Sequence, residues 1–162
     1  MKTLILTLIL AFSVQENSNF SANGDFIVWE KTFTSQNLDI TSIAGKVGLK
    51  VTSDENGVYK GKAKQIKSNC DNASALTKND IVFDFEIITE GDTYTVTVSN
   101  LGIVEKFGPM QARSIVNKAE KHFMHNGSIK TNEQTQNDMA CIDHTLNTVF
   151  SVNTGNQHIT NN

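Results

Sequence analysis

The sequence predicts an α+β fold, in which an antiparallel sheet of four or five strands carries C-terminal helices on one face. Between residues 26 and 99, apolar and polar residues alternate with a period of two, and two turn signals join the alternating segments into successive hairpins. After residue 108, apolar residues instead recur at intervals of three and four, which is the spacing of amphipathic helices. A chain of 162 residues suits a single domain, expected here over residues 25–152.

The N-terminus has the pattern of an export signal. Lys2 precedes the apolar run TLILTLILAF, and a run of about ten residues is too short to span a bilayer, which takes about 20. Small or polar residues follow, with Ala11 and Ser13 placed for cleavage. We expect a signal peptide at 1–15, a flexible lead-in at 16–24 and a polar tail at 153–162, with export to the periplasm or beyond and no membrane span. A buried N-terminal strand or helix is the alternative.

The first expected strand is FIVWEKTF at residues 26–33, in which Ile27, Trp29 and Phe33 share one face. A brief helix is expected next, because Leu38, Ile43 and Val47 have near-helical spacing.

The stretch SDENGVYKGKAKQIK at residues 53–67 raises the question of a phosphate-binding loop. Such a loop presents backbone N–H groups at the start of a helix, whereas this stretch continues as an alternating strand. Asn56–Gly57 readily adopts the positive φ values of a type I′ hairpin turn. Gly61 and Ala63 are expected to keep the sheet thin where a helix packs, while the lysines of the same strand face solvent.

A second hairpin is expected at residues 81–99, with its turn at residues 90–92. One face carries apolar residues, and the other carries Asp84 and Glu86. We expect cross-strand pairs between these carboxylates and the lysines of the preceding hairpin. On an exposed face the two carboxylates lack the desolvation that acid–base catalysis requires.

Two helices are expected after this hairpin. Gly108–Pro109 precedes a stretch at residues 110–125 in which Ile115, Ala119 and Phe123 are spaced by four. A second helix is expected from Thr131, and its apolar stripe consists of Met139, Ile142, Leu146, Val149 and Phe150.

The composition excludes some partners and leaves one bond undecided. The chain has eighteen Asn, a single Arg (Arg113) and a net charge of −3, which argues against nucleic acid and anionic membranes as partners. Cys70 and Cys141 permit a disulfide in an oxidising compartment, while a buried free thiol at Cys141 is the alternative.

Two further site hypotheses use residues near the C-terminus. His122, His125 and His144 could meet around a transition metal, although solvated histidines fit this spacing better. A small apolar ligand could occupy a cavity between sheet and helices, and the lining residues would be Phe83, Phe85, Ile115 and Phe123. No nucleophile or metallohydrolase motif occurs, so the sequence favours a protein without enzymatic activity, catalytic residues, metal or cofactor.

The order of elements resembles a family of secreted bacterial domains of unknown function with a TATA-binding-protein-like (TBP-like) fold. The resemblance covers about half of the chain and consists of a glycine-rich strand and a tyrosine-containing hairpin. The matching residues are Gly57, Tyr59, Gly61, Lys62, Phe83, Phe85, Ile87, Gly91, Asp92, Tyr94 and Asn100. Thr93 stands where the family usually has a basic residue. The resemblance implies a fold and an exported location, and no catalytic residues.

The sequence therefore predicts an exported binding or interaction module of the cell envelope, whose partner is an unidentified protein or small molecule. Its candidate surfaces are the polar face of the sheet, an exposed strand edge and the groove beside the terminal helices. A carrier of a small apolar ligand and a metal-binding protein are the alternatives.

Overall fold

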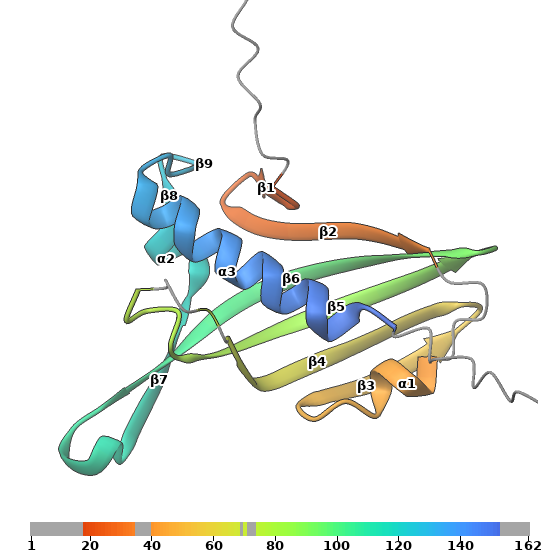
Figure 1. Ribbon diagram of the computed structural model, residues 1–162, viewed down its shortest axis with the longest axis horizontal. Coiled ribbons are helices and arrows are strands. Elements are labelled where there is room, and N and C mark those ends of the chain that lie inside the picture. The colour runs from red at the N-terminus through yellow and green to blue at the C-terminus, as the bar shows by residue number, and fades with distance from the viewer. Residues whose placement is uncertain (1–17, 35–39, 69, 71–73, 153–162) are drawn as a thin grey trace, which may run out of the picture.

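A computed structural model of the protein describes residues 18–34, 40–68, 70 and 74–152. The expected signal peptide (1–15), the tail (153–162) and Leu38 lie outside these residues. Seven strands form one antiparallel sheet in the order β1-β2-β6-β5-β4-β3, and β7 pairs with the far part of β6 (Figure 1). The predicted α+β class is confirmed, with a larger sheet than the four or five strands expected.

The strands of the sheet are β1 (Phe20–Asn23), β2 (Phe26–Thr34), β3 (Leu49–Glu55), β4 (Val58–Lys67), β5 (Asp80–Glu90), β6 (Thr93–Phe107) and β7 (Arg113–Lys118). A short separate hairpin consists of β8 (Met124–His125) and β9 (Ser128–Ile129). The helices are α1 (Ile40–Ala44), α2 (Ala119–Phe123) and α3 (Glu133–Phe150), and a 3-10 turn spans Pro109–Gln111.

The end of the expected lead-in is part of the sheet. β1 pairs with β2, where Phe20 lies opposite Trp29 and is buried. The Asn19 side chain donates a 2.7 Å hydrogen bond to Asp143 of α3. Residues 18–24 are therefore attached to the core and do not form the loose segment expected for 16–24, of which residues 16 and 17 lie outside the described chain.

Both predicted hairpins form as expected. Asn56 and Gly57 have φ values of 51° and 80° in the turn between β3 and β4. The β5–β6 pair buries the alternating apolar residues of both strands, among them Phe83, Phe85 and Tyr94. In the brief helix α1, Ile43 is fully buried, whereas Val47 lies outside the helix and is 96% exposed.

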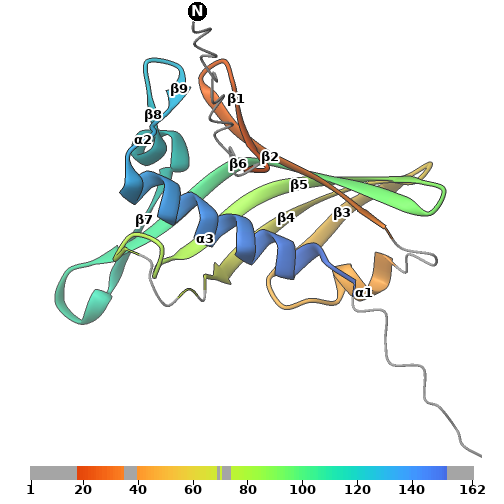
Figure 2. The same cartoon turned by 45° about the horizontal axis from the view of Figure 1, so that its top comes forward.

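The helix expected at 110–125 is wrong for most of its length. Residues 113–118 form β7, which pairs with β6 so that Ile115 faces Glu105 and Val116 faces Val104. Of the predicted stretch, only Ala119–Phe123 is α-helical. β-Branched residues favour the extended backbone, and the prolonged β6 supplies a pairing partner there. The end of this β6–β7 hairpin projects beyond the rest of the sheet (Figures 1 and 2).

The C-terminal helix α3 lies across one face of the sheet (Figures 1 and 2). Asn132 caps its start by accepting a hydrogen bond from the Thr135 N–H group, one residue later than the start expected at Thr131. The predicted stripe is buried at Met139, Ile142, Leu146 and Phe150, and Val149 is partly buried. The Phe150 ring lies 5.5–6.1 Å from the rings of Trp29, Phe83 and Phe85.

Several polar contacts fix α3 on the sheet. Asp143 accepts a 2.7 Å hydrogen bond from the Trp29 indole, which would otherwise be a buried donor without a partner. The Lys46 ammonium donates to the carbonyl oxygens of residues 148, 149 and 151 at the end of the helix, where a cation is favourable. The structure also joins Cys70 to Cys141 in a disulfide, so the connection between β4 and β5 is bonded to α3.

Candidate binding site on the uncovered face of the sheet

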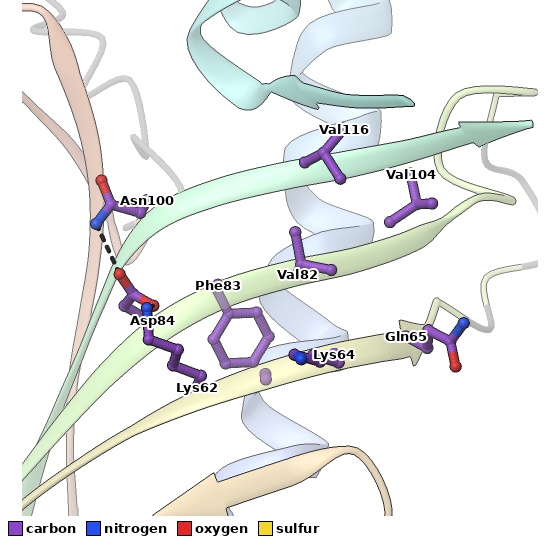
Figure 3. A pocket seen from close by; sticks show the side chains of 10 residues that line it. Lys62, Lys64, Gln65, Val82, Phe83, Asp84, Asn100, Val104 and Val116 are labelled. Carbon is purple, nitrogen blue, oxygen red and sulfur yellow. Dashed lines mark hydrogen bonds and ion pairs between the residues drawn. The ribbon is translucent and has the colours of Figure 1, made fainter. Parts of the chain in front are cut away.

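The long helix α3 lies across one side of the sheet (Figures 1 and 2), and we call the opposite side, seen in Figure 3, the uncovered face. Along β4 and β5 this face carries Lys60, Lys62, Asp84 and Glu86, as the alternation predicts. On β2 and β6 it carries threonines, of which Thr32 and Thr95 share a 2.9 Å hydrogen bond. The uncovered face is therefore polar along most of its length.

The predicted pairs between lysines and carboxylates are confirmed. Lys60 lies 2.7 Å from Glu86, and Lys62 lies 3.3 Å from Asp84. The hydrogen bond and the charge of Glu86 raise the pKa of Lys60. Such exposed pairs contribute little to stability and define no catalytic site.

A pocket of about 560 Å³ opens at one end of this face, next to the ion pairs (Figure 3). Its apolar part includes Val82 on β5, Val104 on β6 and Val116 on β7. Its polar part comes from β4, β5 and β6. The polar lining residues are Lys62, Lys64, Gln65, Asp84 and Asn100. The pocket thus has an apolar surface on one side and charged or amide groups on the other.

Two β-bulges shape this pocket. The register between β4 and β5 shifts after Ala63, and the register between β5 and β6 shifts after Val82. Gln65 and Asn100 lie at these shifts with φ values of 57° and 52°. Residues other than glycine seldom adopt such angles, which cost free energy and are concentrated at functional sites. Bulges are likewise frequent beside binding sites, where they redirect side chains.

A glycine allows the valines of the pocket to approach each other. Gly102 lies between Val82 of β5 and Val116 of β7, on the central strand β6. A Cβ atom added there would lie 2.6 Å from the Val116 side chain and 3.1 Å from that of Val82. Because real Cβ atoms do not approach so closely, the apolar part of the pocket requires glycine at this position.

A smaller hollow of about 370 Å³ adjoins the pocket and shares Lys62 and Asp84 with it. It is lined mainly by the ion-paired and hydroxyl-bearing residues of the uncovered face, among them Thr52, Thr97 and Ser99. The pocket and the hollow thus lie on either side of the ion pair between Lys62 and Asp84.

The sequence analysis named the polar face and missed the pocket. The signal was nevertheless present in the sequence, because the inward apolar positions run 94, 96, 98 and then 101 and 103. This break in the period of two marks the bulge at Asn100. A similar break separates the buried Ala63 from the buried Ile66 and marks the bulge at Gln65.

The structure does not gather the three histidines into a metal site. His122 Nε2 lies 3.1 Å from Glu105 Oε1, whereas His125 and His144 are exposed on β8 and α3. Within the described residues, no group of three or more His, Cys, Asp or Glu side chains is placed to hold a metal ion.

The apolar cavity expected between sheet and helices is also not formed by its four predicted residues. Phe83, Phe85 and Phe123 are buried in the hydrophobic core. Ile115 lies on the projecting β6–β7 hairpin and is 51% exposed. Phe83 lines the pocket on the uncovered face and also packs on Phe150 of α3.

No protein-family model and no curated protein matches this sequence. Among solved structures, a TBP-like protein from Parabacteroides distasonis ATCC 8503 matches with a TM-score of 0.49 and 16% identity, over 79% of this chain and 92% of its own. A DUF4468 family protein from Bacteroides ovatus ATCC 8483 matches with a TM-score of 0.44 and 12% identity, over 82% and 83%. Both are bacterial proteins, and the first has the TBP-like description that the sequence resemblance implies. None of the helices described here has the length and apolar character to span a membrane.

Proposed function

We propose that this chain is an exported binding module of the cell envelope without enzymatic activity, and that its recognition site is the pocket on the uncovered face. The observation that supports this most directly is the meeting of two bulges, with Gln65 and Asn100 at positive φ, around one pocket. Its volume of about 560 Å³ lies within the range of small-molecule sites, about 300–1,000 Å³.

The lining of the pocket favours binding over chemistry. Apolar walls with a few placed polar groups are typical of small-molecule sites. Of its titratable groups, Asp84 is engaged by both Lys62 and Asn100. A carboxylate held in this way, on an exposed face, is a poor general base.

The pocket can be tested with an apolar-to-charged substitution. We expect the wild-type protein, recovered from its own secretory route without added ligand, to carry extra mass in native mass spectrometry. Val116→Asp should abolish that mass, because it places a charge against the apolar wall. Val116 is 54% exposed, so the substitution should leave the fold intact.

The matched control for this substitution is Val47→Asp, which makes the same change at a position outside the pocket that is 96% exposed. The control should keep the wild-type mass. Retention of the extra mass by Val116→Asp, or a wild-type chain without bound mass, would count against the pocket as the recognition site.

Export is tested separately. Lys2 and the apolar run at 3–12 support it, and so does the disulfide, because such bonds persist in oxidising compartments. Deleting residues 2–15, or replacing Leu8 with Lys inside the run, should remove the protein from the exported fraction in an immunoblot of separated compartments. Lys78→Glu, an exposed change elsewhere, should not. An unchanged distribution of all variants would contradict export through this segment.

A further inference from the structure

One lysine of the pocket differs from its neighbours on β4. The outward residues of this strand are Lys60, Lys62 and Lys64, and the first two lie opposite Glu86 and Asp84 of β5. The next outward residue of β5 is Val82 (Figure 3). The series of ion pairs therefore stops at the pocket, where Val82 occupies the position at which the pattern would place a carboxylate.

Lys64 has no ion pair and no side-chain hydrogen bond with the described residues, and its side chain is exposed. The other cation of the lining, Lys62, is balanced by Asp84 at 3.3 Å. The second oxygen of Asp84 accepts a 2.8 Å hydrogen bond from Asn100, so this carboxylate is already occupied. One positive charge at the pocket is left without a counter-charge.

The apolar side of the pocket lies next to this charge. Val82, Val104 and Val116 line it from three adjacent strands, and Gly102 brings two of them together. An apolar group placed there would remove these side chains from water, which is favourable. A cationic group would be repelled by Lys64, and a neutral head group would leave the ammonium without an ionic partner.

We propose that the pocket binds a small amphiphile with an anionic head group, such as a carboxylate or a phosphate monoester on a short alkyl chain. This inference rests on the proposed function and names the ligand class of the same site. The Lys64 ammonium binds the anion through charge-assisted hydrogen bonds, and the valines contact the chain. Gln65 follows Lys64 in the chain and also lines the pocket, and its amide, which forms no hydrogen bond with the described residues, can donate to an anion.

Four probes with a common ten-carbon chain test the head group: decanoate, decyl phosphate, decanol and decyltrimethylammonium, each below its micelle concentration in calorimetric titrations. At least one anionic probe should bind about tenfold more tightly than decanol, and the cation should bind most weakly. Comparison of decanoate with decyl phosphate shows which anion the site prefers.

Lys64→Glu should reduce the affinity for the anionic probes by about tenfold or more, with little effect on decanol. Lys78→Glu has the same change in charge at an exposed position outside the pocket and should bind like the wild type. Lys64→Gln, which keeps a neutral donor, should give an intermediate affinity and guards against a folding defect in the first variant.

Three results would each overturn the anionic ligand class. These are equal binding of anionic and cationic probes, equal losses of affinity in Lys64→Glu and Lys78→Glu, and no binding of any probe. The proposed function has a separate readout, because native mass spectrometry of wild type and Val116→Asp detects a pocket ligand of any charge. If all four probes bind equally and Val116→Asp abolishes their binding, the pocket stands and its ligand class is wrong. If Val116→Asp changes neither probe binding nor native mass, both the proposed recognition site and its ligand class are wrong.

Discussion

Replacing Gly61 with alanine should lower the free energy of unfolding by about 3 kcal/mol. Gly61 lies directly opposite Phe85 in the β4–β5 pair. A Cβ atom at this position would lie 2.2 Å from the Phe85 ring and 2.6 Å from the backbone oxygen of Lys50. The ring has little room to move, because it packs edge-on against Phe150 at 5.5 Å. The substitution must therefore displace either strand β3 or the centre of the core.

Urea unfolding followed by circular dichroism measures this loss. Gly91→Ala is the control, because nothing lies within 4 Å of its added Cβ atom. Its φ of +57° leaves only the cost of a left-handed backbone, which should lower the free energy of unfolding by about 1 kcal/mol. In a Phe85→Leu background, Gly61→Ala should lower the free energy of unfolding by a smaller amount, because the leucine side chain is shorter than the ring that the added Cβ atom would meet. Equal losses for Gly61→Ala and Gly91→Ala would contradict the steric explanation.

Removing the disulfide should destabilise the protein by about 4 kcal/mol. The bond joins residues 71 positions apart, and closing a loop of this length restricts the unfolded chain by that amount in the chain-entropy model. The double variant Cys70→Ala/Cys141→Ala avoids leaving a free thiol. For a chain of this size, the loss corresponds to a fall in Tm of about 10 °C.

Reduction of the wild-type protein provides an internal control for this prediction. A thiol reductant should lower the Tm of the wild type to that of the double variant and leave the variant unchanged. A smaller fall in Tm would mean that other contacts hold the connection between β4 and β5 on α3 when the disulfide is reduced. These contacts are the hydrogen bonds that Asp138 accepts from the N–H and hydroxyl groups of Ser74. A wild type indifferent to the reductant would show that the bond is absent in solution.

The sequence was sufficient to predict the structure where one local pattern determines it. Asn56–Gly57 predicts its turn, and the alternation in β4 and β5 predicts both the buried face and the ion pairs of Lys60 and Lys62. The turn and the alternation depend on neighbours in the chain, and the ion pairs need only that the outward faces of β4 and β5 lie side by side. The same locality explains why the apolar stripe of α3 was found.

Prediction failed where the partner is distant or the pattern is ambiguous. Ile115, Ala119 and Phe123 have helical spacing, yet Ile115 belongs to a strand because β6 extends far enough to pair with it. Breaks in the period of two mark the two bulges in the sequence, but placing both at one pocket also requires the strand register across β4 to β7. Lys64 looked identical to Lys60 and Lys62 until that register showed which of them lacks a carboxylate opposite.

The position of Phe150 has a consequence for the order in which the chain can fold. This residue ends α3, is fully buried, contacts three aromatic rings from β2 and β5, and accepts a 2.8 Å hydrogen bond from the Tyr94 hydroxyl. A nascent chain that has not yet been synthesised to this point leaves those rings without their central neighbour. The core therefore cannot be completed before the chain has been synthesised to Phe150. Until then, the rings of Trp29, Phe83 and Phe85 lack the neighbour that they share in the folded protein.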